Sequence, residues 1–236
     1  MGLERSGAGA ISNRAGRRAV AVTSATLAVV IVSVATILAI IGLAIALVFN
    51  PVWIGFAQDR AGVPALTGYT PAQVRAASDS ILTDVIFGPP DFRVAVDGDP
   101  VLGPTERLHM TDVYQVTRMF ATVIGISVLA LLAIVWPNRH RAWAWRAVAR
   151  GSATLALAGL VISVAVVFFF DAAFLAFHLI FFPQGNFQFD PRTQRLTALF
   201  PEQLFSETAV ALAFAGLTIA LAVTLLARRA ADRATA

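Results

Sequence analysis

The chain has 236 residues, of which 58% are hydrophobic and only 14% are charged, with a formal net charge of +4. Soluble domains carry about 25% charged residues, so this chain has too few polar groups to cover the surface of a water-soluble globule. Disorder is excluded too, because disordered chains are poor in apolar residues. The sequence contains no Cys and no Lys, which excludes disulfides, thiolate chemistry and Schiff-base mechanisms. The composition predicts an integral membrane protein.

Four apolar stretches are long enough to cross a bilayer as helices, since a hydrocarbon core of about 30 Å needs roughly 20 helical residues. They cover about residues 19–49, 117–136, 152–182 and 207–227. The first is longer than the core of roughly 7–15 residues found in cleaved signal peptides, so we expect it to be retained. The expected fold class is an all-α, four-span transmembrane helical bundle, with residues 19–229 forming a single integral membrane domain.

Arginines mark one side of the predicted membrane protein. They gather in the N-terminal tail (residues 1–18), in the loop after the second stretch (139–150) and at the C-terminal end (228–233). The positive-inside rule makes these segments cytoplasmic, as does an even number of spans. The Ala- and Arg-rich composition is typical of a GC-rich bacterial genome. We therefore expect a multi-pass protein of the bacterial cytoplasmic membrane, with both termini, including the short tail 230–236, in the cytoplasm.

The same arginines explain the basic isoelectric point near 10.9. Their positions beside the spans indicate topology and contact with anionic lipids, so we expect no nucleic-acid partner. Two segments then face outward, about residues 50–116 and 172–206, and the first forms an extracytoplasmic cap between spans one and two. Within this cap, Thr70-Pro71 predicts the start of a helix and Gly88-Pro89-Pro90 predicts its end.

Three further local signals concern the ends of the outward segments. Asp97-Gly98-Asp99-Pro100 predicts the turn of a short hairpin. Thr105 is predicted to cap a helix that continues into span two. Leucines and phenylalanines between residues 196 and 205 predict a short interfacial helix, interrupted at Pro201.

Two of the three histidines fall near the expected outer membrane surface. His109 precedes span two by eight residues, and His178 lies near the outer end of the stretch 152–182. Because a short loop joins spans two and three, these spans should lie antiparallel and bring both imidazoles to one outer-leaflet site. The alternative is two unrelated interfacial histidines. His140 lies in the Arg-rich cytoplasmic loop, where we expect it to be solvated.

Each outward histidine has an acidic companion. Asp112 follows His109 by three residues, and Asp171 precedes His178 by seven, so each pair lies on one face of a continuous helix. A carboxylate in an apolar run should have a partner. Arg118, at the mouth of span two, is the expected partner of Asp171, and that pair would alternatively serve only to join two helices.

Two histidines and a carboxylate suit general acid–base chemistry, in which one imidazole acts as base while the other acts as acid or stabilises an oxyanion. The nearby hydroxyls, those of Ser78, Ser80 and Ser206, do not lie in a nucleophile-elbow motif. This favours a reaction in which the substrate supplies its own nucleophile. The alternative interpretation of these residues is a metal site formed by two histidines and a carboxylate, although the HExxH motif is absent. We expect no cofactor.

The residues around both histidines resemble the signatures of a known family. Glu106-Arg107-Leu108-His109-Met110-Thr111-Asp112-Val113 is similar to the "E..HM.DV" signature of a bacterial four-span membrane family that includes the lipoprotein intramolecular transacylases. Phe177-His178-x-x-Phe181-Phe182-Pro183 and Asn186-x-x-Phe189-x-Pro191 resemble its second signature. Tyr114 and Phe187 depart from the pattern, where many members have Lys and Trp. The resemblance extends from span one to span four.

The resemblance implies a reaction at the outer membrane face. Such enzymes move the sn-2 acyl chain of a diacylglyceryl-modified lipoprotein onto the α-amino group of its N-terminal Cys. His109 and His178 would be the catalytic pair, Asp112 would orient a histidine or hold the loop, and Asp171 and Arg118 would support the site. The partners would be membrane lipids and the lipidated N-terminus of bacterial lipoproteins. A non-catalytic envelope protein and a metal-dependent outer-leaflet hydrolase are the alternatives.

Overall fold

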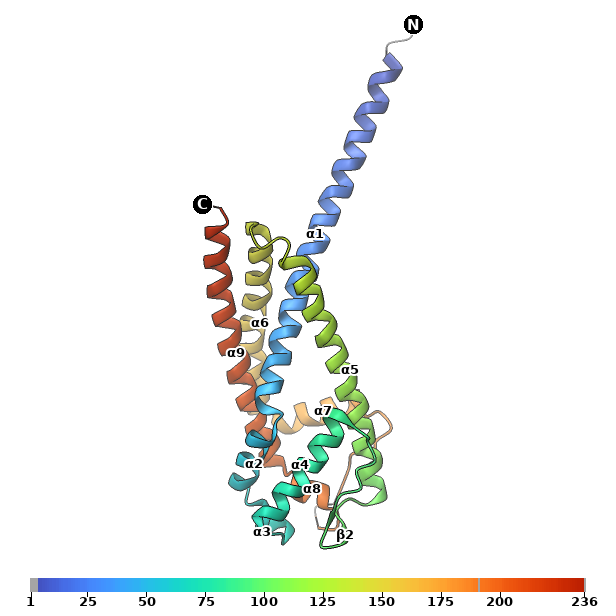
Figure 1. Cartoon of the computed structure of the whole chain (residues 1–236), viewed down its shortest axis with the longest axis vertical. Coiled ribbons are helices and arrows are strands. Elements are labelled where there is room, and N and C mark those ends of the chain that lie inside the picture. Colours follow the sequence, from blue (N-terminus) through green and yellow to red (C-terminus); the bar gives the residue numbers. More distant parts are fainter. Residues whose placement is uncertain (1–3, 191, 236) are drawn as a thin grey trace.

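The computed structural model describes residues 4–190 and 192–235, and the side chains of residues 24–190 and 192–235. Residues 1–3 and 236 of the predicted tails therefore lie outside the described residues. Four long helices form a bundle, namely α1 (Glu4–Val48), α5 (Pro104–Val135), α6 (Ala142–Phe168) and α9 (Glu202–Arg233). Each contains a stretch long and apolar enough to cross a membrane, which confirms the predicted all-α, four-span bundle. The first residues of α1 and the last of α9 lie at the same end (Figure 1).

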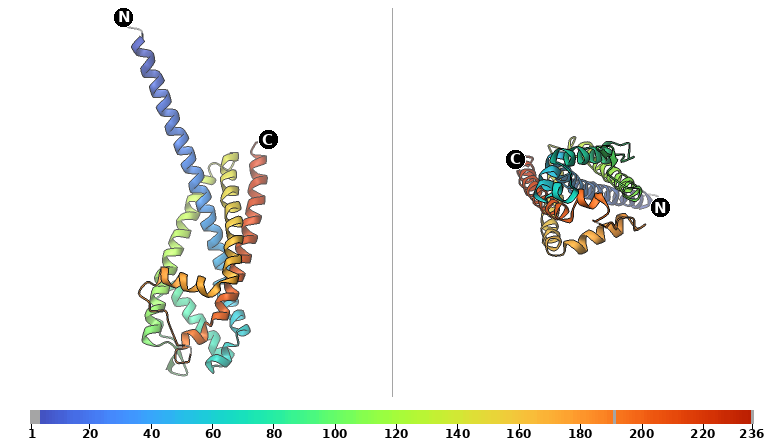
Figure 2. Two further views of the ribbon diagram at one scale, coloured as in Figure 1. Left: turned by 180° about the vertical axis from the view of Figure 1, so that it is seen from behind. Right: turned by 90° about the horizontal axis from the view of Figure 1, so that it is seen from below.

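The third predicted span is two helices rather than one. The apolar stretch 152–182 is divided at Phe169, between α6 and α7 (Phe170–Phe181). Phe169 has φ −131° and ψ 42°, which lie outside the helical region and end the α6 hydrogen-bonding pattern. Figure 2 shows α7 lying across the bundle instead of continuing along it. Hydropathy does not reveal this change of direction, because both helices are apolar.

The helices of spans two and four begin before the apolar stretches that predicted them. Helix α5 starts at Pro104, close to the start predicted at Thr105 and well before the apolar stretch that begins near residue 117, and α9 starts at Glu202 instead of near residue 207. The 32 residues of α5 extend about 48 Å at 1.5 Å per residue, well beyond a hydrocarbon core of about 30 Å. The first turns of α5 therefore project from the spanning part of the bundle toward the cap.

The cap follows the predicted pattern. It contains α2 (Pro51–Arg60), α3 (Val63–Thr67), α4 (Pro71–Phe87) and a hairpin of β1 (Ala95–Val96) and β2 (Asp99–Pro100). Thr70 and Gln73 form a capping box at the start of α4, and Gly88 ends that helix. Asp97 and Gly98 have φ of 53° and 88°, the left-handed conformations that a tight hairpin turn requires.

The start of α5 differs from its prediction. Its N-cap residue is Gly103 rather than Thr105, and Pro104 occupies the first helical position. Glycine has no side chain with which to cap the helix, but Glu106 compensates: its Oε2 accepts a hydrogen bond from the Gly103 N–H at 2.6 Å. The interruption predicted at Pro201 is confirmed, because this residue separates the short helix α8 (Arg195–Leu199) from α9.

Close contact between α1 and α6 depends on Gly151. A Cβ there would lie 2.3 Å from the backbone oxygen of Ser33, whose Oγ donates a hydrogen bond to the Ala147 carbonyl at 3.0 Å. We expect Gly151→Ala to separate the helices and lower the free energy of unfolding by about 1–3 kcal/mol, measured by thermal denaturation in detergent. Gly159→Ala, in the same helix, is the control because its Cβ meets nothing within 4 Å. Equal losses in both variants would contradict this account.

Candidate active site

Two histidines from distant segments meet at the cap end of the bundle. His109 lies in the second turn of α5, and His178 lies in α7; their ring centroids are 6.1 Å apart, with planes inclined by 20°. His109 is 6% exposed, whereas His178 is half-buried. The extension of α5 beyond the spanning region and the transverse course of α7 bring the rings together. The structure therefore places these two predicted site residues side by side.

Phenylalanine rings enclose the histidine pair. The rings of Phe182 and Phe189 lie 4.8 and 5.4 Å from that of His109. Those of Phe174 and Phe187 lie 4.2 and 4.9 Å from the ring of His178. Such an apolar wall limits the access of water and strengthens electrostatic interactions within the site.

A backbone carbonyl fixes the tautomer of His178. Its Nδ1 lies 2.8 Å from the carbonyl oxygen of Phe174, one turn earlier in α7. Because a carbonyl oxygen only accepts hydrogen bonds, Nδ1 carries the hydrogen of the neutral ring and Nε2 holds the lone pair. His178 therefore offers Nε2 as a proton acceptor or, once protonated, as a proton donor.

Asp112 contacts the loop after α7 rather than a histidine. Its Oδ2 accepts hydrogen bonds from Asn186 Nδ2 at 2.6 Å and from Gln184 Nε2 at 2.7 Å. The same loop carries Phe187 and Phe189, two of the rings that enclose the histidine pair. Of the two roles that the resemblance implies for Asp112, these contacts support the one in which it holds the loop.

The structure does not bring Asp171 and Arg118 together. Both side chains are exposed, and neither belongs to any of the ion pairs found over residues 24–190 and 192–235. The break at Phe169 is the reason, because Asp171 lies in the first turn of α7 instead of on a span facing α5. The predicted contact is not formed. His140 is exposed in the loop between α5 and α6, as expected.

Two polar residues beside the histidines, Glu106 and Asn186, belong to the two signatures but were given no role from the sequence. Glu106 is only 3% exposed, and its Oε1 accepts a hydrogen bond from the Leu196 N–H at 2.7 Å. Its position three residues after the helix N-cap is the capping-box signal that would have identified it. Asn186 lies close to His109, and its partner Asp112 is 74 residues away in the sequence, so no local pattern predicts that contact.

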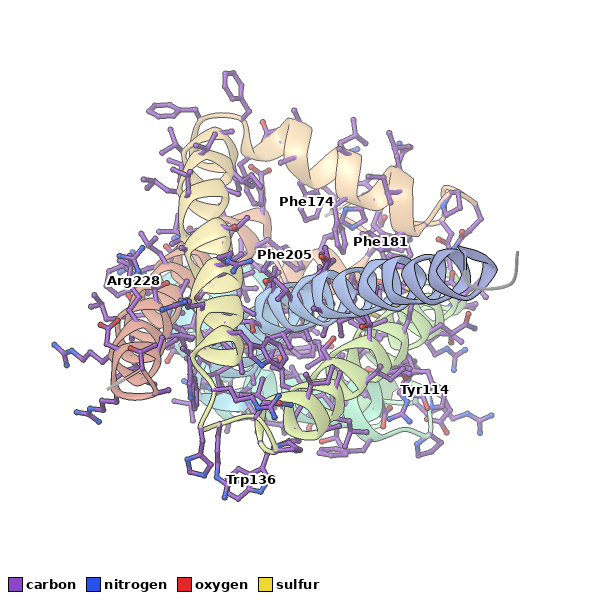
Figure 3. The ribbon with its side chains drawn as sticks, turned by 90° about the horizontal axis from the view of Figure 1, so that it is seen from above. Tyr114, Trp136, Phe174, Phe181, Phe205 and Arg228 are labelled. Carbon is purple, nitrogen blue, oxygen red and sulfur yellow. The ribbon has the colours of Figure 1, made fainter. Side chains whose placement is uncertain are left out.

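An apolar groove borders the histidine pair. It has a volume of about 560 Å³ and is lined by Phe174, Leu175, Phe187, Gln188, Phe189, Asp190 and Thr197. All three phenylalanines in this lining also contact a histidine ring. Phe174 and Phe181 are directed from α7 toward the interior, where Phe205 of α9 lies 5.4 Å from Phe174 (Figure 3). The groove thus offers an apolar wall next to two titratable groups, which suits a lipid substrate.

The donor set does not form the two-His-plus-carboxylate metal site that was considered as an alternative. Among the described side chains, no group of three or more His, Asp or Glu residues is placed to hold a metal ion. His109 and His178 lack a carboxylate as third ligand, because Asp112 is engaged by two side-chain amides. The geometry of this site therefore suits proton transfer between organic groups rather than metal coordination.

Known proteins share this architecture. The profile of the family described as "Lipoprotein intramolecular transacylase Lit" matches residues 30–205. The structure of the lipoprotein intramolecular transacylase Lit from Bacillus cereus aligns with a TM-score of 0.75 at 20% sequence identity, covering 89% of this chain and 97% of that chain.

Two variants of the Bacillus cereus protein, each substituted at a histidine, align comparably. Their TM-scores are 0.70 and 0.71 at 19% and 18% identity, covering 92% of this chain and 97% or 98% of theirs. At these identities the structural likeness establishes the fold. No curated protein sequence matches this chain. The matching profile, however, spans most of the chain and includes both His109 and His178. The chain belongs to the lipoprotein intramolecular transacylase (Lit) family.

Proposed function

We propose that this protein moves an acyl chain from the diacylglyceryl group of a bacterial lipoprotein to the α-amino group of the lipoprotein's N-terminal Cys. Membership of the transacylase family supports this activity. The observation that carries it is the pair of imidazoles, 6.1 Å apart, beside an apolar groove. We assign His109 and His178 as the catalytic residues and Asp112 as a positioning residue.

The reaction requires a base and an acid but no nucleophile from the protein. The substrate amine attacks the ester carbonyl, a C–N bond forms, and one imidazole takes a proton from the nitrogen. The proton passes to the other imidazole, the C–O bond to glycerol breaks, and the glycerol oxygen receives that proton. Both rings are then neutral again, so no co-reactant is consumed. Nε2 of His178 is suited to either role, because its Nδ1 is bound to the Phe174 carbonyl.

The apolar enclosure of the site favours transfer over hydrolysis. Water competes with the amine for the ester carbonyl, and the rings of Phe182 and Phe189 cover His109 on the protein side. The groove beside these rings holds the acyl chain in our proposal. A non-catalytic role in the envelope is not favoured, because it explains neither the paired imidazoles nor the family match.

We further propose that the site faces the outer side of the bacterial cytoplasmic membrane, with both termini in the cytoplasm. The arginine-rich segments support this orientation through the positive-inside rule. The first residues of α1 and the last of α9 lie on the same side of the bundle, opposite the cap (Figure 1). Phe168 and Phe169, at the turn from α6 to α7, are 75% and 68% exposed, as expected for side chains in contact with lipid. An acyl ester of a membrane-anchored lipoprotein lies at this depth.

Mass spectrometry of the N-terminal lipopeptide of one lipoprotein tests the activity, in a bacterial host that lacks N-acylation. Expression of this protein should move one acyl chain from glycerol to the amine, which fragmentation reveals, while the total mass stays the same. Loss of an acyl chain with a matching drop in mass would show a hydrolase instead. An unchanged lipopeptide, despite good expression and membrane insertion, would contradict the proposed function.

A further inference from the structure

Two buried polar atoms beside the histidine pair lack hydrogen-bond partners. They are Nδ1 of His109 and Oδ1 of Asn186, two of the three such side-chain atoms in the described part of the chain. The Asn186 side chain also lies within interacting distance of the His109 ring. A buried polar group without a partner costs about 1–3 kcal/mol. One atom is a ring nitrogen that can carry a hydrogen and the other is an amide oxygen that accepts one, so the two are complementary, although no hydrogen bond joins them in this structure.

Asp112 fixes the orientation of the Asn186 amide. Asn186 Nδ2 donates to Asp112 Oδ2 at 2.6 Å. An ionised carboxylate only accepts hydrogen bonds, so the NH2 end of the amide must face Asp112 and the oxygen must lie on the opposite side. Gln184 Nε2 also donates to this Oδ2, at 2.7 Å, in an exposed hydrogen bond. The amide is therefore not free to flip, and only its oxygen is available to the ring.

We propose that Asp112 and Asn186 form a chain of hydrogen bonds that sets the tautomer of His109. Asp112 holds the Asn186 amide, and Asn186 Oδ1 accepts the hydrogen of His109 Nδ1. The lone pair of the neutral ring then lies on Nε2, which is left free for the reaction. Asn186 is a positioning residue in this arrangement, and Asp112 acts on His109 only through it. The inference rests on the proposed catalytic role of His109.

The two catalytic rings are then prepared in the same way. His178 donates from Nδ1 to the Phe174 carbonyl oxygen, a neutral acceptor, and His109 donates to an amide oxygen, also neutral. A carboxylate in direct contact would fix the tautomer too, but it would stabilise the imidazolium ion more strongly. A neutral acceptor lets the ring release its proton to the glycerol oxygen. This difference explains why Asn186 lies between the Asp112 carboxylate and the His109 ring.

Nitrogen NMR of histidine-labelled protein in detergent micelles reads the tautomer without requiring any activity. In the wild type, neutral His109 should carry its hydrogen on Nδ1, and the signal is assigned by its loss in His109→Gln. Asn186→Ala should remove this preference and slow acyl transfer by on the order of 10-fold or more. Gln184→Ala is the matched control, because it removes the other donor to Asp112 and leaves the Asn186 contact in place.

An exchange of the two side chains provides a rescue. Asp112→Asn and Asn186→Asp each disturb the chain. The first replaces an acceptor-only carboxylate by an amide that can present either its oxygen or its NH2 group, so the Asn186 amide is no longer held in one orientation, and the second places two carboxylates together. The double variant restores a continuous chain, because an amide at position 112 then donates to a carboxylate at position 186, which accepts from the ring; since this carboxylate contacts the ring directly, we expect the rate of the double variant to stay below that of the wild type. We expect the double variant to be on the order of 10-fold faster than either single variant.

The outcomes separate this inference from the proposed function. A wild-type His109 with its hydrogen on Nε2, a tautomer unchanged in Asn186→Ala, or a double variant no faster than the singles would each overturn the inference, even with acyl transfer established. A hydrogen on Nδ1 that depends on Asn186, in a protein that transfers no acyl chain, would support the hydrogen-bond chain and contradict the proposed reaction.

Discussion

His109→Ala and His178→Ala should each reduce acyl transfer to less than about 1% of the wild-type rate, because a positioned general acid or base contributes about 10²–10⁴-fold. The two rings lie 6.1 Å apart in one apolar enclosure, so neither loss is compensated by water entering freely. The lipopeptide assay described above measures both variants, as the fraction of acyl chain found on the amine against time.

Loss of activity must be separated from loss of structure. His109 is 6% exposed and contacts Phe182 and Phe189, so its truncation opens a cavity, whereas His109→Gln keeps most of the volume. His178 is half-buried, which makes His178→Ala the milder change. His140→Ala, on the exposed loop, is the matched control and should keep the wild-type rate. All variants should insert in the membrane, and their thermal transitions in detergent should show that they are folded.

The double variant with both histidines replaced should be no slower than the slower single variant. Residues that act as one unit show such non-additive losses, because removing either one already stops the shared step. If instead the two effects multiply, the rings contribute independently and the paired mechanism is wrong. A rate above one tenth of wild type in His178→Gln would equally contradict the assigned proton transfer.

The sequence predicts those parts of the molecule that depend on long or local signals. Four spans follow from apolar stretches of about 20 residues or more, and the helix from Pro71 to Phe87 follows from Thr70-Pro71 at its start and Gly88-Pro89-Pro90 at its end. The meeting of His109 and His178 was also expected, from antiparallel packing of spans two and three, but it arises from the extension of α5 and the transverse course of α7. The predictions of the spans and of the cap helix use residues that are neighbours in the sequence or a periodicity that persists over many turns.

The features that the sequence did not reveal depend on contacts between residues that are far apart in the chain. No glycine or proline marks the break at Phe169, and the course of α7 is instead set by packing such as that of Phe181 against Phe120, 5.3 Å away. Asp112 was expected either to orient a histidine or to hold the loop, and its partners, which come from the loop after α7, support the second role. Such pairings have no local signature, because their energies depend on the folded arrangement.

Glu106→Ala should destabilise the cap by about 2–5 kcal/mol, because it removes the acceptor of two backbone N–H groups. Oε2 of this carboxylate accepts from Gly103 at 2.6 Å and Oε1 accepts from Leu196 at 2.7 Å. One side chain thereby caps the helix that carries His109 and joins it to α8. Without the carboxylate, both N–H donors remain without an acceptor. Water does not readily take its place, because the position of Glu106 is only 3% exposed.

Glu106→Gln distinguishes this role from simple packing. Glutamine has nearly the same volume, but its amide has one acceptor oxygen, so its NH2 group must face one of the two backbone donors. We expect it to lose about 1–3 kcal/mol of unfolding free energy. Glu202→Gln, an exposed carboxylate in the first turn of α9, is the matched control and should change stability by less than about 0.5 kcal/mol. Thermal denaturation in detergent compares the three variants; a Glu106→Gln protein as stable as Glu202→Gln would show that volume alone, and not the paired acceptors, holds α5 against α8.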